Sequence, residues 1–499
     1  MRTMQINFRR VFWLLIALSL GMSFTRVWAD TLPTSITKAL KQARVPLSAV
    51  SFEVRKIDNK TDSNVAPLLS HRANVPMNPA SVMKLVTTFS ALDMLGPDFT
   101  WQTSFYTNGK LSNGVLQGDL IIHGGGDPKW VLERIEENFK TLQVLGVRHI
   151  TGDIILDNSV FELTKKHEAD FDGEHLSPYN STPDGLLVNF KAIILTFTPD
   201  ELTQTVRVKS EPPIAGVSID STVPMGNNSC GDWRSGLRAD FTHPDRISFA
   251  GSYSARCGEK VWPIAYSDPA TFAARVVKAM YNAAGGRLDG QVRTGTLPTS
   301  AVLLYHAPSL PLSQIIADVN KFSNNVMAQQ VFLSLSAQES KDNLLGKISQ
   351  KLKGSFNKSR DVVKHWWQRH FGKNKSQTTE PELENGSGLS RSERITAHSL
   401  SELLHTAAKH PHADVFAKSL SIAGVDGTAA NMAKRGVANA SIGQAQLKTG
   451  TLRDVVSIAG YATAQSGQRY SVVGIINHPN APSARAALDA LVEWTVVDH

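Results

Sequence analysis

The sequence predicts a mixed α/β fold in which an antiparallel sheet is flanked by helices and a large β-rich region is inserted into the chain. An apolar helical pattern with a serine in its first turn begins near residue 81, and three alternating strands lie between 446 and 477. Short strands and turns fill much of the interval between them. With 499 residues the chain exceeds one ordinary domain, so we expect roughly two or three.

Residues 1–29 are predicted to be an export signal that is cleaved. Arginines precede the apolar run 11–20, and Val27-Trp28-Ala29 resembles a cleavage site of small residues. The alternative is a membrane anchor, but the run is short for a bilayer and Arg26 follows it. Arg2, Arg9, Arg10 and Arg26 carry half of the formal net charge of +8. The mature chain is therefore only mildly basic, which gives little support to a role in binding nucleic acid.

Ser81 is the candidate nucleophile, and Lys84 is its candidate base. Apolar residues recur at helical spacing after Pro79, so Ser81 lies in the first turn and Lys84 one turn further on the same face. A serine hydroxyl is a weak nucleophile at neutral pH and needs such a base. The same Ser-x-x-Lys pattern also begins at Ser35 and Ser355. The pattern alone therefore does not identify the site.

Two downstream motifs favour Ser81. Ser323-Asn324-Asn325 falls on a polar connector between the helical patterns 312–319 and 326–335, and Lys448-Thr449-Gly450-Thr451 lies on the first strand of the terminal meander. The order Ser-x-x-Lys, Ser-x-Asn, Lys-Thr-Gly is that of penicillin-recognising serine enzymes. Arg293-Thr294-Gly295-Thr296 resembles the third motif, but it precedes Ser323 and has arginine in place of the lysine. We therefore treat it as a decoy.

The remaining elements follow from periodicity and turn residues. A hairpin is predicted over 47–69, with a polar turn at 58–60. Gly124 to Pro128 is predicted to be a tight turn, because it lacks the ending of a phosphate-binding loop. Further strands are predicted at 114–122, 152–156, 186–197, 204–209 and 246–254, in addition to 446–451, 455–462 and 469–477. Further helices are predicted at 129–145, 268–284, 398–410 and 483–497.

The chain has two cysteines, Cys230 and Cys257, and both lie in one Gly- and Ser-rich region. In an exported chain a disulfide that closes this loop is favoured over two free thiols. A metal site built on two cysteines would need further ligands, and none lies nearby. We therefore predict a structural disulfide, and we expect neither a metal nor another cofactor.

With these motifs the chain resembles the class C low-molecular-mass penicillin-binding proteins, the D-alanyl-D-alanine carboxypeptidase/endopeptidase family. Secondary signatures are Gly118-Asp119-Leu120 with 124–128, Ser181-Thr182-Pro183 and the run from Gly386 to Arg391. Ser323 follows Ser81 by 242 residues, and a large insertion at this place is typical of the family. The chain departs from the family at Asn385, where Asp is frequent, and in a long basic stretch at 341–375.

The resemblance implies a penicilloyl-serine transferase (β-lactamase-like) core, a five-stranded antiparallel sheet flanked by helices. Residues 30–98 and 299–499 would form this discontinuous transpeptidase-like catalytic domain. Residues 99–298 would form the inserted β-rich domains, with a nested subdomain around 198–262. The catalytic cleft would lie between the sheet and the helical lobe.

The resemblance also implies a periplasmic serine DD-peptidase that acts on peptidoglycan stem peptides. It would trim D-Ala-D-Ala termini, cleave D-Ala-diaminopimelate cross-links, or do both, through an acyl-serine that β-lactam antibiotics also form. Chemistry and resemblance together suggest that Lys84 activates Ser81, Ser323 relays the proton and Asn325 orients Lys84 and the substrate. The terminal carboxylate would be bound by Lys448, Thr449, Gly450 and Thr451, and the oxyanion by the backbone N–H groups of Ser81 and Thr451.

Two other functions remain open at this point. A β-lactamase would need rapid hydrolysis of the acyl-enzyme, for which one class uses a glutamate-held water, and we identify no such glutamate. The other alternative is a penicillin-binding scaffold that recognises the cell wall with little catalysis.

Two charged segments carry further hypotheses. The acidic run 168–174 could meet the side-chain ammonium of the stem peptide, or be a solvated charge cluster. Residues 341–375 contain ten basic and two acidic residues and a stripe with Trp366 and Trp367. This stripe either packs on the core or supports a peripheral contact with an anionic membrane face.

Overall fold

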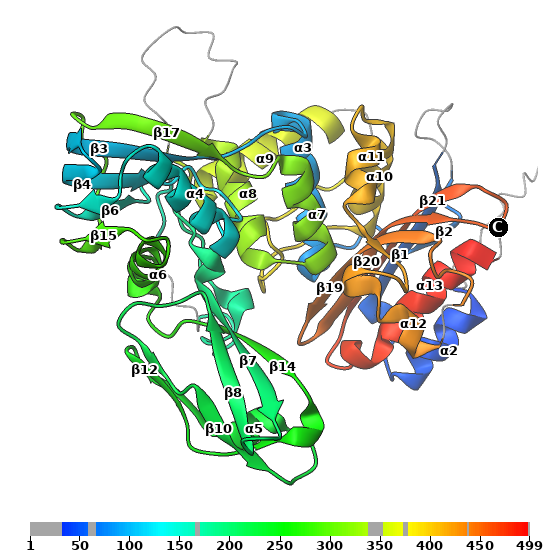
Figure 1. Ribbon diagram of the computed structural model, residues 1–499. Helices are drawn as coiled ribbons and strands as arrows, with labels where there is room; N and C mark the ends of the chain where they lie inside the picture. The colour runs from blue at the N-terminus through cyan, green and yellow to red at the C-terminus, as the bar shows by residue number, and fades with distance from the viewer. Residues whose placement is uncertain are drawn as a thin grey trace, which may run out of the picture.

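The computed structural model describes residues 32–57, 66–164, 170–337, 353–372, 378–436 and 439–497 (Figure 1). The predicted export signal at 1–29 and the predicted turn at 58–60 lie outside the described residues. In the described part of the chain, no helix has the length and apolar character needed to cross a membrane.

One antiparallel sheet joins the two ends of the chain. Within the described residues it has six strands in the order β18-β19-β20-β21-β1-β2. Their bounds are β1 (Val50–Lys56), β2 (Leu69–His71), β18 (Ser421–Ile422), β19 (Ala445–Leu452), β20 (Val455–Thr463) and β21 (Arg469–Asn477). The predicted terminal meander and the predicted pairing of β1 with a following strand are confirmed. The sheet has one strand more than the resemblance implies.

Helices cover both faces of this sheet (Figure 1). On one face α2 (Thr34–Gln42) and α13 (Arg485–Val497) share an apolar core with the strands. On the other face lie α3 (Lys84–Leu95), α7 (Leu312–Phe322), α8 (Asn325–Ala337), α9 (Phe356–Phe371), α10 (Ala397–Lys409) and α11 (Ala413–Lys418). Because both faces are covered, residues 455–462 of β20 are all buried, including the polar Ser457.

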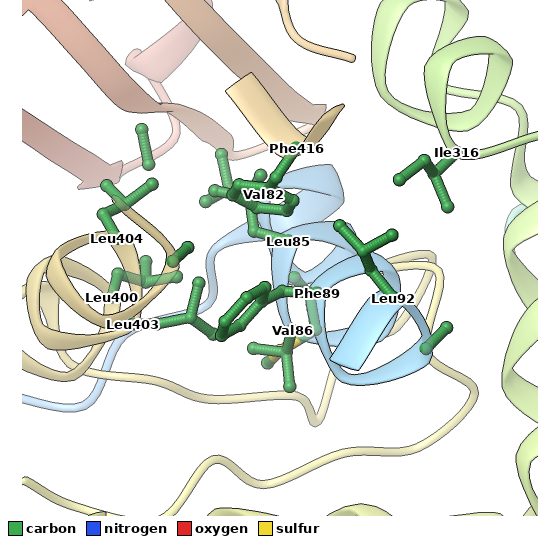
Figure 2. Packing of buried hydrophobic residues seen from close by; sticks show 14 of the residues in the cluster. Val82, Leu85, Val86, Phe89, Leu92, Ile316, Leu400, Leu403, Leu404 and Phe416 are labelled. Carbon is green, nitrogen blue, oxygen red and sulfur yellow. The ribbon is translucent and has the colours of Figure 1, made fainter. Parts of the chain in front are cut away.

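The helix that follows Ser81 is buried on all sides. It begins as a short 3₁₀ turn, η2 (Ala80–Met83), and continues as α3 up to Gly96. Figure 2 shows Phe89 and its neighbours on α3 packed among apolar side chains of α7, α10 and α11. Residues 84–92 of α3 are all buried, so the turn that carries Ser81 is fixed on a rigid element.

The segment between α3 and α7 forms separate sheets. A seven-stranded sheet contains β3 (Gln102–Ser112), β4 (Val115–His123), β5 (His149–Ile150), β6 (Ile154–Asp157), β15 (Arg287–Leu288), β16 (Val292–Thr294) and β17 (Val302–Pro308). It packs with α4 (Leu132–Val144) and α6 (Pro269–Ala283) around an apolar core that is separate from the core around α3 and continues into the rest of the insertion. The predicted division into domains at 98 and 298 stays a prediction, although the pairing of β17 with β3 extends this sheet to residue 308.

Two smaller sheets lie below the seven-stranded one in Figure 1. The first contains β7 (Ala192–Asp200), β8 (Thr205–Glu211), β10 (Thr222–Gly226), β13 (Tyr253–Ser254) and β14 (Lys260–Ala265). The second contains β9 (Ser218–Ile219), β11 (Ala239–His243) and β12 (Arg246–Phe249), and α5 (Trp233–Leu237) lies beside them. The predicted Cys230–Cys257 disulfide is present here.

Two predicted strands of the insertion are wrong in their bounds. The strand predicted at 186–197 begins only at residue 192, because residues 189–191 all have positive φ and interrupt the extended chain. The strand predicted at 246–254 is split, because backbone bonds from Gly251 and Ser252 to the end of α5 turn the chain aside. Apolar alternation does not reveal either interruption.

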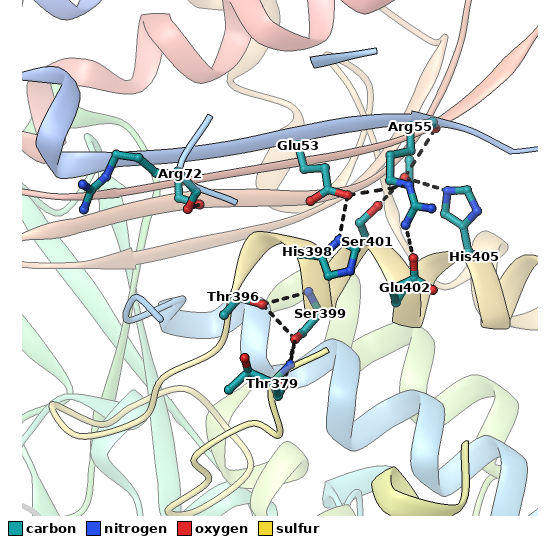
Figure 3. Close-up of polar contacts among 12 residues, drawn as sticks. Glu53, Arg55, Arg72, Thr379, Thr396, His398, Ser399, Ser401, Glu402 and His405 are labelled. Atoms are coloured by element: carbon teal, nitrogen blue, oxygen red, sulfur yellow. Dashed lines mark hydrogen bonds and ion pairs between the residues drawn. The ribbon is translucent and has the colours of Figure 1, made fainter. Parts of the chain in front are cut away.

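A buried polar network joins β1 to α10 (Figure 3). The Arg55 guanidinium binds the Glu402 carboxylate, and its Nε lies 3.7 Å from Glu53 Oε1. His398 Nδ1 lies 3.1 Å from the same Glu53 oxygen, and the His405 ring bonds to Ser471 at 3.1 Å. The network therefore anchors α10 against the sheet through compensated charges.

The basic stretch at 341–375 is described only over residues 353–372, where it forms α9. Its aromatic stripe packs on the core: Trp366, Trp367 and Phe371 are buried beside α3, and the Trp366 indole donates to Asp93 at 2.6 Å. The first of the two alternatives for this stripe is therefore confirmed. A contact with a membrane would have to use the cations without these aromatic side chains.

Candidate active site

The turn before Ser81 is held in a strained conformation. Ala80 has φ +47°, which costs a residue with a Cβ on the order of 1 kcal/mol. The Asn78 carboxamide accepts from Ala80 N at 2.8 Å. In turn, Asn477 at the end of β21 bonds both backbone groups of Asn78, at 2.8 and 2.9 Å. The sheet thus fixes the position of Ser81.

Gly450 allows β19 to approach this turn closely. A Cβ at this position would lie 2.2 Å from Ser457 Oγ, 2.6 Å from Pro79 O and 3.1 Å from Ser81 N. Ser457 Oγ itself donates to Pro79 O at 2.5 Å. The glycine of the Lys-Thr-Gly motif is therefore required for packing of the strand against the candidate nucleophile.

Lys84 lies directly under Ser81 and is fully buried. Its Nζ donates to Ser81 Oγ at 2.9 Å, to Asn325 Oδ1 at 2.7 Å and to Ser387 O at 2.5 Å. Burial, and then the Lys448 ammonium, lower the pKa of Lys84 well below its usual value, while Glu393 acts in the opposite direction. A lysine with a depressed pKa can be neutral near pH 7 and accept the serine proton.

Lys448 faces the same space from β19. Its Nζ donates to Ser323 Oγ at 2.9 Å and to Thr449 O at 2.8 Å, and burial lowers its pKa to about 7. Ser323 ends α7 with a left-handed φ of +59°, which turns the chain into α8. The three predicted motifs are thus brought together around Ser81.

Other side chains contact the motifs. Asn325, the first residue of α8, donates to Tyr179 O of the insertion at 3.0 Å. Thr449 Oγ1 donates to Thr428 Oγ1 at 2.7 Å, and Thr451 Oγ1 accepts from Arg485 at 3.3 Å. No sequence motif marks Thr428 or Arg485, because these residues reach the site only through the fold.

The Gly-rich loop 385–390 closes the site on the side of Lys84. Its Ser387 carbonyl accepts from Lys84, and a Cβ at Gly388 would collide with the Ala80 carbonyl at 2.0 Å. Asn385 Oδ1 accepts from Ser387 N and Oγ at 2.9 and 2.7 Å. In the sequence this run is only a family signature, and none of its residues is predicted to belong to the site.

The other candidate motifs have structural roles. The Ser35-x-x-Lys38 pair is exposed on α2, and Ser355 caps α9 by accepting from Lys358 N at 3.4 Å. Arg293 on β16 binds Asp153 at 2.6 Å. Gly124 to Pro128 forms a turn whose Gly126 carbonyl accepts from Gln330 of α8 at 3.2 Å. Their exclusion from the site is therefore consistent with the geometry.

The described part of the acidic run, 170–174, lies at the rim of the site. Phe171 packs against the small cluster of Ala80, Leu452 and Val455, and the Arg391 guanidinium lies 4.7 Å from the centre of its ring. Asp172 accepts from Tyr179 Oη and Asn180 Nδ2, each at 2.7 Å, and these hydrogen bonds lower its pKa against the effect of burial. The Asp172 carboxylate thus lies next to Phe171, which packs against the residue before Ser81.

Comparisons with known proteins agree with this geometry. The model of the D-Ala-D-Ala carboxypeptidase 3 (S13) family matches residues 32–496. The D-alanyl-D-alanine carboxypeptidase DacB of Haemophilus influenzae is 24% identical over 412 residues, which cover 80% of each chain. A D-alanyl-D-alanine carboxypeptidase of an Actinomadura species is 25% identical over 443 residues, which cover 85% of this chain and 78% of the relative.

Solved structures show the same fold. The crystal structure of penicillin binding protein 4 from Haemophilus influenzae has a TM-score of 0.71 at 21% identity, and covers 92% of this chain and 98% of that one. A second structure of that protein, complexed with a β-lactam, has a TM-score of 0.66 at 20% identity and the same coverage. As its resemblance to class C low-molecular-mass penicillin-binding proteins predicts, the chain belongs to the D-Ala-D-Ala carboxypeptidase 3 (S13) family.

Proposed function

We propose that this DD-peptidase cleaves the D-Ala-D-Ala terminus or the D-Ala-diaminopimelate cross-link of peptidoglycan through an acyl-enzyme on Ser81. The observation that carries the proposal is the hydrogen bond of 2.9 Å between Ser81 Oγ and a fully buried lysine amine. Ser323 and Lys448 share a hydrogen bond of 2.9 Å and line the other side of the candidate active site.

Acylation begins when neutral Lys84 accepts the proton of Ser81 Oγ, which attacks the carbonyl carbon of the penultimate D-alanine. The backbone N–H groups of Ser81 and Thr451 stabilise the oxyanion. Collapse of the tetrahedral intermediate breaks the C–N bond, and the leaving nitrogen receives a proton through Ser323. In hydrolysis a water then attacks the ester, with Lys84 again as the base, and Ser81 is regenerated.

The terminal carboxylate is bound by Lys448 with the hydroxyl groups of Thr449 and Thr451. Lys448 has a pKa of about 7 in the free enzyme, because it is buried. An incoming carboxylate favours the charged ammonium, so substrate binding and protonation of Lys448 support each other. Arg485, which donates to Thr451 Oγ1, adds positive charge at this end of the site.

β-Lactams acylate Ser81 in the same way, because the strained ring presents its carbonyl and carboxylate to the same groups. Peptidoglycan as substrate places the enzyme outside the cytoplasmic membrane, in agreement with the predicted export signal, and we propose the periplasm. We further propose that residues 30–98 and 299–499 form the catalytic domain around the inserted residues 99–298.

Asp172 is the residue we propose for recognising the side-chain ammonium of the stem peptide. It stands at the rim of the site, and its hydrogen bonds with Tyr179 and Asn180 favour the charged form. Replacement of Asp172 by Asn should raise KM for a peptide with a free side-chain amine and leave an N-acetylated peptide unchanged. Equal effects on both peptides would assign Asp172 to support of the loop instead.

Release of D-alanine from a synthetic pentapeptide, together with mapping of a penicillin adduct, tests the proposal. The adduct should map to Ser81, and Ser81→Ala should abolish both the adduct and D-alanine release. Ser355→Ala is the matched control, because Ser355 starts the same four-residue pattern as a helix cap.

The two alternatives predict different outcomes. A scaffold would carry the adduct without releasing D-alanine. A β-lactamase would turn over nitrocefin without accumulating an adduct. An adduct at a residue other than Ser81 would refute the assignment of the nucleophile.

A further inference from the structure

A buried carboxylate, Glu393, lies behind the loop that holds Lys84. Its exposed fraction is 1%, and its Oε1 accepts from the backbone N–H groups of Glu384, Asn385 and Gly386 at 2.9, 3.1 and 3.3 Å. Among the described residues, its Oε2 has no hydrogen-bond partner. Burying a carboxylate with one oxygen unpaired is costly.

The loop bound by Glu393 leads directly to the candidate base. Asn385, held through its own N–H, uses its side chain to fix Ser387. The Ser387 carbonyl accepts from Lys84 Nζ, and the neighbouring Gly386 carbonyl accepts from Thr87 Oγ1 at 2.6 Å. Loss of the Glu393 contacts would release three backbone donors at the start of this path.

Glu393 is also a counter-charge for the buried Lys84. The charged groups that act on Lys84 are Lys448 from β19 and Glu393, of opposite sign. Glu393 itself is faced by Lys84 and by the carboxyl of Glu384, which accepts from Ser390 and Ser392 at 2.6 and 3.0 Å. Burial raises the pKa of the Glu393 carboxyl, while the N–H donors of residues 384–386 lower it. Residue 385 of the loop is a neutral amide, so Glu393 is the fully buried acidic group on this side.

We infer that Glu393 is a positioning residue for Lys84: it anchors the loop whose carbonyl binds the amine, and its charge opposes that of Lys448. This inference rests on the proposed function of Lys84 as the base for Ser81. It adds a residue that belongs to none of the three motifs and touches neither the substrate nor Ser81.

Two variants separate the two parts of this role. Glu393→Gln keeps an oxygen that can accept from the loop but removes the charge. Without the carboxylate, Lys84 should lose its proton at lower pH, so the acid limb of the acylation rate should move down by roughly 0.5 to 1 pH unit. Glu393→Ala also removes the anchor, and acylation should fall by about tenfold or more at every pH.

The experiment measures the rate of acylation by a fluorescent penicillin between pH 5 and pH 9, with kcat and KM for a D-Ala-D-Ala peptide. Glu382→Gln is the matched control, since Glu382 lies in the same segment but is exposed, and its profile should match the parent. We expect kcat to change more than KM in both Glu393 variants.

A Glu393→Gln profile that coincides with that of the parent enzyme would overturn the role as counter-charge. Unchanged rates in Glu393→Ala would overturn the anchor. If the alanine variant does not fold, the glutamine variant still decides the inference. Failure of the parent enzyme to form an adduct at Ser81 would instead refute the proposed function, and with it the basis for this inference.

Discussion

Two buried polar regions lie on the face of the central sheet that α3 and α10 cover, and their charges are balanced differently. Between β1 and α10, the Arg55 guanidinium contacts the carboxylates of Glu53 and Glu402 (Figure 3). Around Ser81, two buried lysines share one space, and Glu393 is set behind a loop. In the first region a carboxylate lies on each side of the Arg55 cation. In the second, the two lysine amines have no carboxylate in direct contact among the described residues.

This difference separates a structural site from a reactive one. A buried ion pair with its partners in place keeps its groups charged and unreactive. A buried lysine with a second cation nearby has a depressed pKa and can act as a base. The two regions should therefore respond differently to substitution: the Arg55 network through stability, and the lysines through acylation.

The largest effect is expected at Lys84. Lys84→Arg keeps a cation in place but holds it protonated, so acylation of Ser81 should fall on the order of 10³-fold or more. The rate of penicillin binding measures this, with the midpoint of thermal unfolding as a check on the fold. Lys38→Arg, in an exposed copy of the same pattern, is the control and should change neither quantity. Substantial acylation by Lys84→Arg would show that another group is the base.

In the unaltered enzyme we expect the same lysine to set the pH dependence of acylation. Burial and Lys448 lower the pKa of Lys84, so the rate of acylation should rise with pH as Lys84 loses its proton, at a pH well below the usual titration of lysine. A rate that increases only above about pH 10, where free lysine titrates, would contradict a depressed pKa.

Arg55 should affect stability instead. Arg55→Met leaves the carboxylates of Glu53 and Glu402 buried without their cation, which costs about 3–5 kcal/mol of unfolding free energy. Combining it with Glu402→Leu should recover part of this loss, because fewer unpaired charges remain. Urea unfolding measures both variants. A loss below about 1 kcal/mol in the single variant would mean that water compensates the carboxylates.

His405 should make the same region sensitive to acid. Burial, and then Arg55, lower its pKa from 6.5 to about 4. Between these values the unfolded chain binds a proton that the folded chain does not. The contribution of His405 to the unfolding free energy is therefore fully present above pH 6.5. It decreases as the pH is lowered, by roughly 3 kcal/mol at pH 4.

His398 acts in the opposite direction. Its hydrogen bond with Glu53 raises its pKa, so its contribution to stability is present below pH 6.5 and is lost as pH rises through the pKa of the folded state.

Because the acid-labile contribution comes from His405, His405→Gln should flatten the acid side of the stability curve. Urea midpoints at pH 7.5 and pH 4.5 give the test, and parallel losses in the variant and the parent would reject the role of His405.

The sequence was informative where chemistry is local. Ser81 and Lys84 lie one turn apart, and the motifs at Ser323 and Lys448 each occupy a few residues, so spacing and order were sufficient to find them. The three terminal strands and the buried helix followed from periodicity. The predicted start of β7 was wrong, because the positive φ angles at 189–191 do not change the apolar pattern of the sequence.

The supporting residues of the site could not be found in this way. Glu393 contacts backbone N–H groups, which every residue except proline has, so no residue type marks its partners. Arg485 reaches Thr451 from the terminal helix only after the sheet has formed. The network of Arg55 brings together residues separated by 347 positions. Such partners depend on tertiary packing, which single-sequence patterns do not encode.

The smallest effect is expected on the exposed side of α9. Lys358 and Lys364 lie 3.5 Å from Glu162 and Glu380, with both lysine side chains largely in water. Exposed pairs of this kind contribute at most about 0.5 kcal/mol each, in contrast to the buried Arg55. Replacing both lysines by glutamine should therefore leave the urea midpoint almost unchanged, while Trp366→Ala on the buried face of the same helix should cost about 3–5 kcal/mol.

The double lysine variant also tests contact with a membrane. Because the aromatic stripe of α9 is buried in the core, any attraction to anionic liposomes would rest on the cations and should fade as salt is added. Co-sedimentation of the parent and the lysine variant at low and high salt measures this. Binding that is lost in the lysine variant would assign the exposed face of α9 to the membrane, and equal sedimentation would leave its lysines as solvated surface.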